Sequence, residues 1–212
     1  MKKSHTRPRG ATLYRKTAFG IIPRSKLLKL EIEGTKKGLE YLHELIKKNK
    51  DVHITPELIC KIHEVSFGWI FPDWAGKYRK IQVTFSGKEA PSYFKIPEFI
   101  INLCNDLEER LKHLPSPDDE SYVLEIVRLL SWFQHKFVFI HPFQDYNGRI
   151  ARILTILILL QLNLPPIELK AEKGTDRKRY IIAMQKADSD DYTLLETLIS
   201  NALSESLHLF RK

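Results

Sequence analysis

Apolar residues recur every three or four positions along most of the chain, which is the spacing of an amphipathic helix. Helices are predicted on this basis over residues 25–49, 57–67, 97–114, 122–141, 176–186 and 192–209. A further apolar run from Ile150 to Leu164 is hydrophobic on nearly every side, which is typical of a buried helix. We therefore predict an all-α fold, a helical bundle around this buried central helix, which begins near Gly148.

Two stretches depart from the simple helical pattern. Gly34 and Gly38 interrupt the first stretch, so residues 25–49 are predicted to form either two helices or one helix with a break near Gly34. Residues 81–86 alternate between apolar and polar side chains, and they are followed by a turn at 87–89 and a short extended run near Tyr93. This second pattern predicts an exposed β-hairpin.

A chain of 212 residues suits one compact domain. We expect residues 1–24 to form a basic N-terminal arm and lead-in, disordered over residues 1–12, and residues 25–212 to form the folded domain. The net charge of +8 permits binding to nucleic acid or to an acidic protein. Because the chain has no helix-turn-helix or zinc-finger pattern, solvated basic faces explain the charge more simply, and direct nucleic-acid binding is not expected.

Cysteine content and hydropathy bear on where the protein works. Cys60 and Cys104 lack the spacing of a metal site and lie in apolar helical patterns, which predicts buried thiols in a reducing compartment. The longest apolar run, residues 153–160, is too short to span a bilayer. The basic residues 1–9 are not followed by the apolar segment of a secretory signal. A cytoplasmic protein that does not bind membranes is therefore expected.

The stretch from His141 to Arg152 carries the candidate chemistry. Pro142 disfavours helical geometry at His141, so the preceding helix should end there and leave the imidazole at a chain reversal. Asn147 and Gly148 tolerate tight turns in which several N–H groups point at one spot. A concave patch of amides is thus predicted where the central helix begins.

Charged residues around this patch indicate an anion site. Arg149 and Arg152 lie three residues apart on one face of the first helical turn, where arginine opposes the helix dipole and has little structural purpose. Two guanidiniums and a helix N-terminus suit a polyphosphate. Asp145 could hold a divalent cation against the phosphates, and His141 could act as a general base.

This stretch, H-P-F-Q-D-Y-N-G-R-I-A-R, resembles the signature of the Fic (Fic/Doc) family, H-x-F-x-[DE]-G-N-G-R-x-x-R. One position departs from the signature, because Tyr146 stands where the family usually has glycine. The resemblance implies a Fic-type helical bundle with one small β-hairpin flap. The matching residues are His141, Phe143, Asp145, Asn147, Gly148, Arg149 and Arg152.

The resemblance also implies an activity, the transfer of AMP from ATP to a hydroxyl side chain (Ser, Thr or Tyr) of a target protein. His141 would be the general base, and Asp145 would hold Mg²⁺. Phe143 would be a core anchor. The remaining roles concern the nucleotide: the amides of 146–148 and the Asn147 side chain at the α-phosphate, Arg149 and Arg152 at the β- and γ-phosphates, and Tyr180 beside the adenine.

Two further segments resemble parts of the family. Ile32-Glu33-Gly34 is similar to the end of an inhibitory helix, [ST]-x-x-x-E-[GN], although Lys29 stands at the Ser/Thr position. This similarity implies that residues 25–49 form an inhibitory helix whose Glu33 pairs with Arg152. Residues 74–79 look like the A-G-x-[YF]-R segment that precedes the flap, which implies that a target protein binds along Val83–Tyr93.

Two alternatives stay open on the sequence alone. The chain could be a nucleotide-binding regulatory module with little catalysis, held shut by Glu33 or altered by Tyr146. It could also be a Doc-like toxin that transfers phosphate, although both arginines of the AMP-transferring pattern are present.

Overall fold

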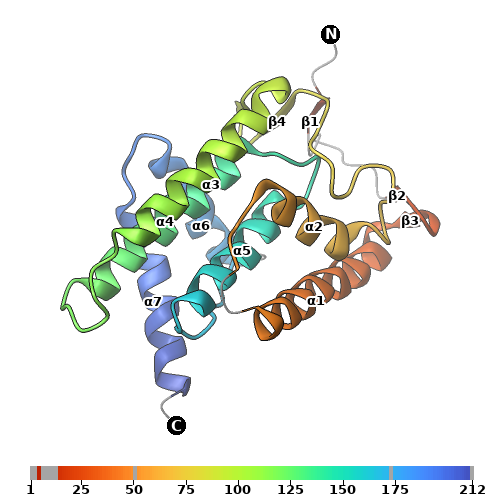
Figure 1. Ribbon diagram of the computed structural model, residues 1–212. Helices are drawn as coiled ribbons and strands as arrows, with labels where there is room; N and C mark the ends of the chain where they lie inside the picture. Colours follow the sequence, from red (N-terminus) through yellow and green to blue (C-terminus); the bar gives the residue numbers. More distant parts are fainter. Residues whose placement is uncertain (1–3, 6–13, 50–51, 172–173, 211–212) are drawn as a thin grey trace.

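Helices dominate the fold of this protein, seen in a computed structural model that describes residues 4–5, 14–49, 52–171 and 174–210. Within these residues the strands are short, and the prediction of an all-α fold is confirmed (Figure 1). The helices are α1 (Arg24–Lys48), α2 (Pro56–Phe67), α3 (Ile96–Lys112), α4 (Tyr122–Ile140), α5 (Asn147–Gln161), α6 (Gly174–Ala187) and α7 (Thr193–Phe210).

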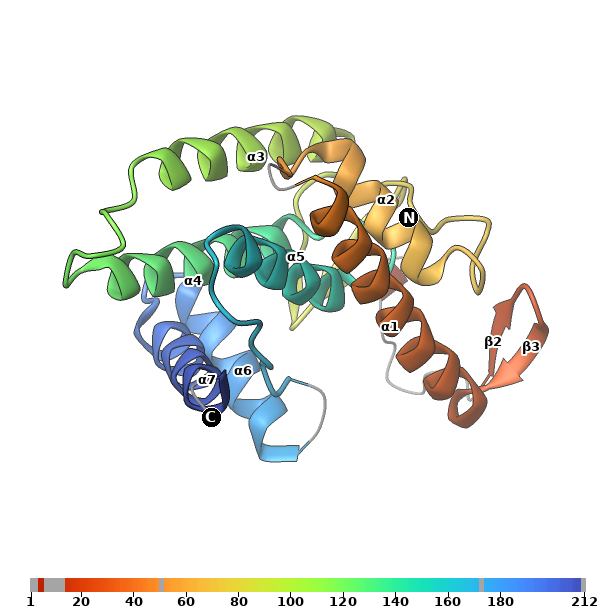
Figure 2. The same cartoon turned by 60° about the horizontal axis from the view of Figure 1, so that its bottom comes forward.

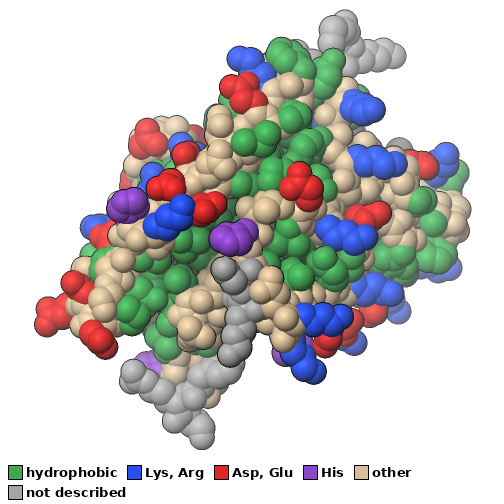
Figure 3. Space-filling view, in the orientation of Figure 1, with side chains coloured by type: hydrophobic (Ala, Val, Ile, Leu, Met, Phe, Trp, Pro, Cys, Tyr) green, Lys and Arg blue, Asp and Glu red, His purple; other side chains and the backbone are tan. Residues whose placement is uncertain are grey.

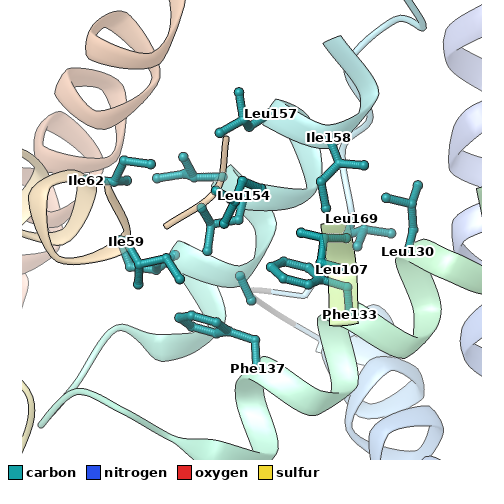
Figure 4. Close-up of a cluster of buried hydrophobic side chains, with 14 of the residues drawn as sticks. Ile59, Ile62, Leu107, Leu130, Phe133, Phe137, Leu154, Leu157, Ile158 and Leu169 are labelled. Carbon is teal, nitrogen blue, oxygen red and sulfur yellow. The ribbon is translucent and has the colours of Figure 1, made fainter. Parts of the chain in front are cut away.

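Helix α5 lies at the centre, as its apolar sequence predicts. It contacts α1, α2 and α4, while α7 packs on the other side of α4 (Figures 1 and 2). Side chains from several helices interlock around it with little or no exposure (Figure 4). Those that Figure 4 labels are Ile59, Ile62, Leu107, Leu130, Phe133, Phe137, Leu154, Leu157, Ile158 and Leu169. Burial of this apolar surface is the main force that holds α5 at the centre of the helical bundle.

Helix α1 is one continuous helix, so the break near Gly34 does not occur. Its buried stripe is Leu27, Glu31, Gly34, Gly38 and Leu42, which face α2. A side-chain carbon at Gly34 would collide with the Ser66 carbonyl oxygen, and one at Gly38 would collide with the Ser66 hydroxyl. The two glycines therefore let α1 and α2 approach closely instead of interrupting α1.

The predicted flap is present but shorter than expected. Strands β4 (Val83–Phe85) and β5 (Lys88–Glu89) pair antiparallel around a turn. The extended run near Tyr93 is wrong, because Tyr93–Lys95 form a single turn of 3-10 helix that leads into α3. Ser86 and Gly87 both have positive φ, which lets the chain reverse tightly between the two strands.

The N-terminal residues form strands that the sequence pattern did not predict. Strands β2 (Tyr14–Thr17) and β3 (Gly20–Pro23) form a hairpin just before α1. Strand β1 (Ser4–His5) pairs in parallel with β4. The expected disordered arm over residues 1–12 otherwise lies outside the described residues.

Surface properties agree with the absence of a membrane-spanning segment in the sequence. Among the described residues, no helix has both the length and the apolar character needed to cross a bilayer. On the face drawn in Figure 3, Lys and Arg side chains alternate with Asp and Glu side chains. That face therefore carries charges of both signs.

The close contact between α1 and α2 predicts the effect of Gly34→Ala. In an exposed helix this change would stabilise by about 1 kcal/mol, because alanine has the higher helix propensity. Here it should destabilise by about 1–3 kcal/mol, because the new methyl group forces α1 away from α2. Urea unfolding measures the difference, with Lys36→Ala on the exposed side of α1 as the control. Equal or greater stability of Gly34→Ala would contradict the packing.

Candidate active site

The loop between α4 and α5, residues 141–146, holds the candidate chemistry. Helix α4 ends at His141, as the following Pro142 predicts, and His141 itself adopts the left-handed conformation, with φ of 52°. Arg79 is 3% exposed and fixes this end of the loop. Its Nε donates to the His141 carbonyl at 2.8 Å, and its backbone N–H donates to the Pro142 carbonyl at 2.9 Å.

Arg79 also ties the loop to the flap. Its two terminal nitrogens donate to the carbonyls of Ile81 at 2.9 Å and Pro91 at 2.5 Å, on either side of the β4–β5 hairpin. Burial lowers the pKa of Arg79 to about 10, but the group stays protonated at neutral pH. The guanidinium thus sets the distance between the flap and His141.

Two buried side chains satisfy the rest of the loop. The Asn147 amide donates to the Phe143 carbonyl at 2.9 Å, and its oxygen accepts from the Phe143 N–H at 2.8 Å. His63 of α2 contacts the Asp145 carbonyl through Nε2 at 3.2 Å and stacks on the Phe143 ring, with ring centroids 3.9 Å apart. The predicted role of Phe143 as a core anchor fits its complete burial.

The imidazole of His141 is arranged as a neutral base. Its Nδ1 lies 3.2 Å from the Val138 carbonyl, which can only accept a hydrogen bond, so Nδ1 carries the proton and the lone pair is on Nε2. Its ring stacks on Phe85 of the flap, with centroids 4.4 Å apart and planes 11° apart. Burial lowers the pKa of His141 to about 4, and the positive charges of Arg79 and Lys88 act in the same direction. His141 is therefore uncharged at neutral pH.

The N-terminus of α5 faces the same region. The first N–H groups of a helix have no partner within the helix, so the amides of Asn147 and Gly148 are available donors at this end. Arg152 folds back over this turn, because a carbon at the Cβ position of Gly148 would lie 3.6 Å from its Nη1. Arg149 and Arg152 thus flank the amides, as the sequence predicts for an anion site.

Tyr146 connects this anion site to α1. Its φ of 63° is the left-handed conformation that the usual glycine of this position would adopt without strain. Its ring stacks on Phe67, with centroids 4.0 Å apart, and on Trp74 at 6.0 Å. Its hydroxyl donates to Glu31 at 2.9 Å. Aromatic packing thus holds Tyr146 in its strained conformation and aims the hydroxyl at α1.

Glu31 is the carboxylate of α1 that reaches the site. It is completely buried, and its Oε2 accepts from Nη2 of Arg149 at 3.1 Å. Arg24 at the start of α1 forms a second ion pair with the same carboxylate. Burial and the neighbouring Glu31 charge raise the pKa of Tyr146. The phenol therefore remains protonated and keeps its hydrogen bond to Glu31.

The expectation that Glu33 would pair with Arg152 is corrected by this geometry. Glu33 lies on the exposed side of α1, whereas Glu31 lies on the buried stripe. Because α1 is unbroken, a shift of two residues turns a side chain by about 200° around the helix axis. The carboxylate at the site is thus Glu31, and the arginine that it contacts is Arg149.

Two residues expected to contact the nucleotide form hydrogen bonds within the protein. Tyr180 of α6 is buried, and its hydroxyl accepts hydrogen bonds from Gln134 at 2.6 Å and from Arg152. It therefore positions Arg152, and its predicted contact with adenine is untested. The Asn147 side chain binds both backbone groups of Phe143 and so shapes the loop, and its role at the α-phosphate stays a prediction.

Asp145 has the accessibility that a cation ligand needs. About a third of its side chain is exposed, at 34%. Oδ1 accepts from the Tyr146 N–H at 2.8 Å, and Oδ2 lies 3.8 Å from Arg15 of β2. Among the described residues, no group of three or more His, Cys, Asp or Glu side chains forms a metal site. A metal held here would depend on Asp145 together with the phosphates of a nucleotide, which is how proteins commonly bind Mg²⁺.

Three residues of the site were not predicted as such. Glu31 was not predicted because Glu33, two residues later, matches the inhibitory motif. The helical spacing of Leu27, Gly34 and Gly38 could have indicated that Glu31 lies on the buried side of α1. Arg79 was recognised only as part of the segment before the flap. His63 gave no local signal, because its partners Gly76 and Asp145 lie far away in sequence.

Burial of His63 predicts how stability depends on pH. Burial lowers its pKa from 6.5 to about 4, and the Gly76 N–H donates to its Nδ1 at 2.8 Å. Between these pKa values the unfolded chain binds a proton that the folded protein excludes, so the free energy of unfolding falls as pH falls. From about pH 7 to about pH 5 the loss from His63 is about 2 kcal/mol.

Urea unfolding of the natural protein and of His63→Gln at both pH values isolates this contribution. Glutamine does not titrate, so the variant should be less stable at neutral pH but should lose about 2 kcal/mol less on acidification. The same pH dependence in both proteins would show that His63 is not held neutral by the fold.

Comparison with known proteins agrees with the motif and the fold. Residues 53–159 match the model of the Fic/DOC family. A relative from Nematostella vectensis, named "Protein adenylyltransferase Fic", is 32% identical over 166 residues, which are 78% of this chain and 36% of the relative. The chain thus spans about a third of the length of the curated relatives that it matches.

Solved structures share the fold at lower identity. A Fic domain containing signalling protein from Bacteroides thetaiotaomicron aligns with a TM-score of 0.68 and 22% identity, over 84% of this chain and 69% of the other. The BepC protein of Bartonella tribocorum, a VirB-translocated effector with bound AMPPNP, aligns with a TM-score of 0.68 and 16% identity, over 93% and 95%. With the loop, the central helix and the motif in place, this chain belongs to the Fic/DOC family.

Proposed function

We propose that this protein transfers AMP from ATP to a hydroxyl side chain of a target protein. The single observation that carries the proposal is a neutral His141, with its lone pair on Nε2, in the loop that leads directly into the start of α5, where Arg149 and Arg152 lie. The relatives named as protein adenylyltransferases support the same reaction.

The residues divide the reaction between a base and a phosphate cradle. Nε2 of His141 takes the proton of the target hydroxyl. At the same time the oxygen of this hydroxyl forms a bond to the α-phosphorus of ATP. The bond from that phosphorus to the oxygen leading to the β-phosphate breaks, and pyrophosphate leaves. Arg149, Arg152 and the α5 amides hold the phosphates and stabilise the negative charge that develops on them. The stack of His141 on Phe85 keeps the imidazole in one orientation.

Asp145 is the residue that would hold Mg²⁺. Mg²⁺ bound with ATP would neutralise phosphate charge. The partial exposure of the carboxylate fits this role. Its Oδ2 forms a long ion pair with Arg15, which a bound cation would replace. Asp145 also accepts the Tyr146 N–H, which keeps the carboxylate directed along the loop.

The flap is the proposed site for the target protein. An extended segment that pairs with a strand of β4–β5 would lie beside Phe85 and hence beside His141. Arg79 would keep this distance constant from one target to the next.

Cys60 and Cys104 are both free thiols, which fits the expected action in the reducing cytoplasm.

Autoinhibition by α1 is part of the proposal, with Glu31 in place of Glu33. The Glu31 carboxylate engages Arg149, so this guanidinium is not oriented toward a phosphate. The Tyr146 hydroxyl and Arg24 hold the carboxylate in place, and its complete burial strengthens these interactions. ATP would have to displace Glu31 from Arg149 in order to bind in line with His141.

Label transfer tests the reaction. With Mg²⁺ and ATP labelled on the α-phosphate, label should enter protein, at least by automodification, and His141→Ala should abolish it. Activity that survives His141→Ala would remove the general base. Label that enters only from the γ-phosphate would indicate phosphate transfer, as in the Doc-like alternative. ATP binding without any transfer would select the regulatory module.

Glu31→Gln and Glu33→Gln form a matched pair that tests autoinhibition. Glu31→Gln should raise label incorporation at least tenfold, which corresponds to about 1.4 kcal/mol of released inhibition. Glu33→Gln should leave the rate unchanged, because Glu33 is exposed. Tyr146→Phe, which removes only the hydroxyl that holds Glu31, should give a smaller rise. Equal rates for the natural protein and Glu31→Gln would contradict the inhibitory role.

A further inference from the structure

The flap is already paired with a strand from the N-terminus of this chain. Strand β1 lies along β4 in parallel, with Ser4 opposite Val83 and His5 opposite Thr84 (Figure 1). Strand β5 pairs with the other side of β4, so the order of this sheet is β1-β4-β5. The edge of β4 that faces away from β5, one of the two edges at which a target strand could join the hairpin, is therefore covered.

We propose that the N-terminal segment of this chain acts as a tethered competitor for the target at the flap. This inference rests on the proposed function, because it names what regulates access to the same site. A target segment could pair with β4 only after β1 has left it. The device is separate from Glu31, which acts on the phosphate cradle and not on the flap.

The main chain of β4 supports this placement. Successive residues of a strand direct their backbone groups to opposite sides. The Val83 carbonyl accepts from the Ala90 N–H at 3.0 Å, on the β5 side, so the backbone groups of Thr84 face β1. The next residue, Phe85, stacks on His141. A strand on this edge therefore passes close to the general base, where a target must also pass.

The tether is short enough to make the competition strong. Strand β2 follows β1 after residues 6–13 and carries Arg15, which forms an ion pair with Asp145. Eight residues reach at most about 29 Å, so β1 cannot move far from the site while β2 stays in place. Because β1 and β4 belong to one chain, their pairing does not depend on the protein concentration. A free target segment must therefore compete with a partner that is always present.

A pair of engineered disulfides tests where β1 lies. His5→Cys with Thr84→Cys joins positions that are direct partners, about 4.8 Å apart as neighbouring strands, within the range that a disulfide can bridge. His5→Cys with Glu89→Cys is the control, because Glu89 lies across β4, two strand spacings or roughly 9–10 Å away.

The first pair should form a monomeric cross-link on mild oxidation, and the control pair should not. Equal cross-linking of both pairs, or none in the first, would overturn the placement of β1. Cross-linked dimers would mean that the arm of a second copy occupies the flap, which also contradicts a tether.

Label transfer by the His5→Cys, Thr84→Cys protein then tests competition. After oxidation and removal of the oxidant, this double variant should transfer label from α-labelled ATP to added lysate proteins at least tenfold more slowly than after reduction. Its affinity for ATP should be the same in both states. The natural protein treated identically is the control. Unchanged transfer after cross-linking would overturn the competition. If the natural protein transfers no label, the proposed function fails, whereas the cross-link still decides whether β1 covers the flap.

Discussion

Buried carbonyl groups of the α4–α5 loop are the constraint on which the rest of this structure depends. The loop reverses the chain against the core, with Pro142, Phe143 and Tyr146 buried, and an unsatisfied backbone carbonyl that is buried costs about 1–3 kcal/mol. Arg79 satisfies the carbonyls of His141 and Pro142, Asn147 that of Phe143, and His63 that of Asp145. Segments distant in sequence therefore converge on the loop, and the position of His141 depends on all of them.

Tyr146 shows how one departure from a family pattern can change the use of a site. Glycine would adopt the left-handed conformation there without strain, whereas tyrosine costs about 1–3 kcal/mol. In return the ring packs against Phe67 and Trp74, and the hydroxyl reaches Glu31. The residue thus joins the anion site to α1, and the strain is offset by contacts that glycine could not make.

Features that depend on local sequence were predicted, whereas features that depend on contacts between distant segments were not. The helices and the loop motif were found because period and turn residues are read within a few positions of each other. The choice between Glu31 and Glu33 required knowing that Gly34 continues α1, which depends on packing against α2. His63 and Arg79 act through partners far away in sequence, and β1 became visible only through its pairing with β4. Such long-range pairs leave no period in a single sequence.

A crystal structure of Glu31→Gln with ATP and Mg²⁺ would test the account most directly. The proposed reaction requires the α-phosphate near Nε2 of His141, the outer phosphates on Arg149 and Arg152, and the metal on Asp145. Arg149 should also turn from α1 toward the nucleotide, since its partner is removed. A nucleotide bound away from the N-terminus of α5, or with its α-phosphate out of reach of His141, would contradict the account.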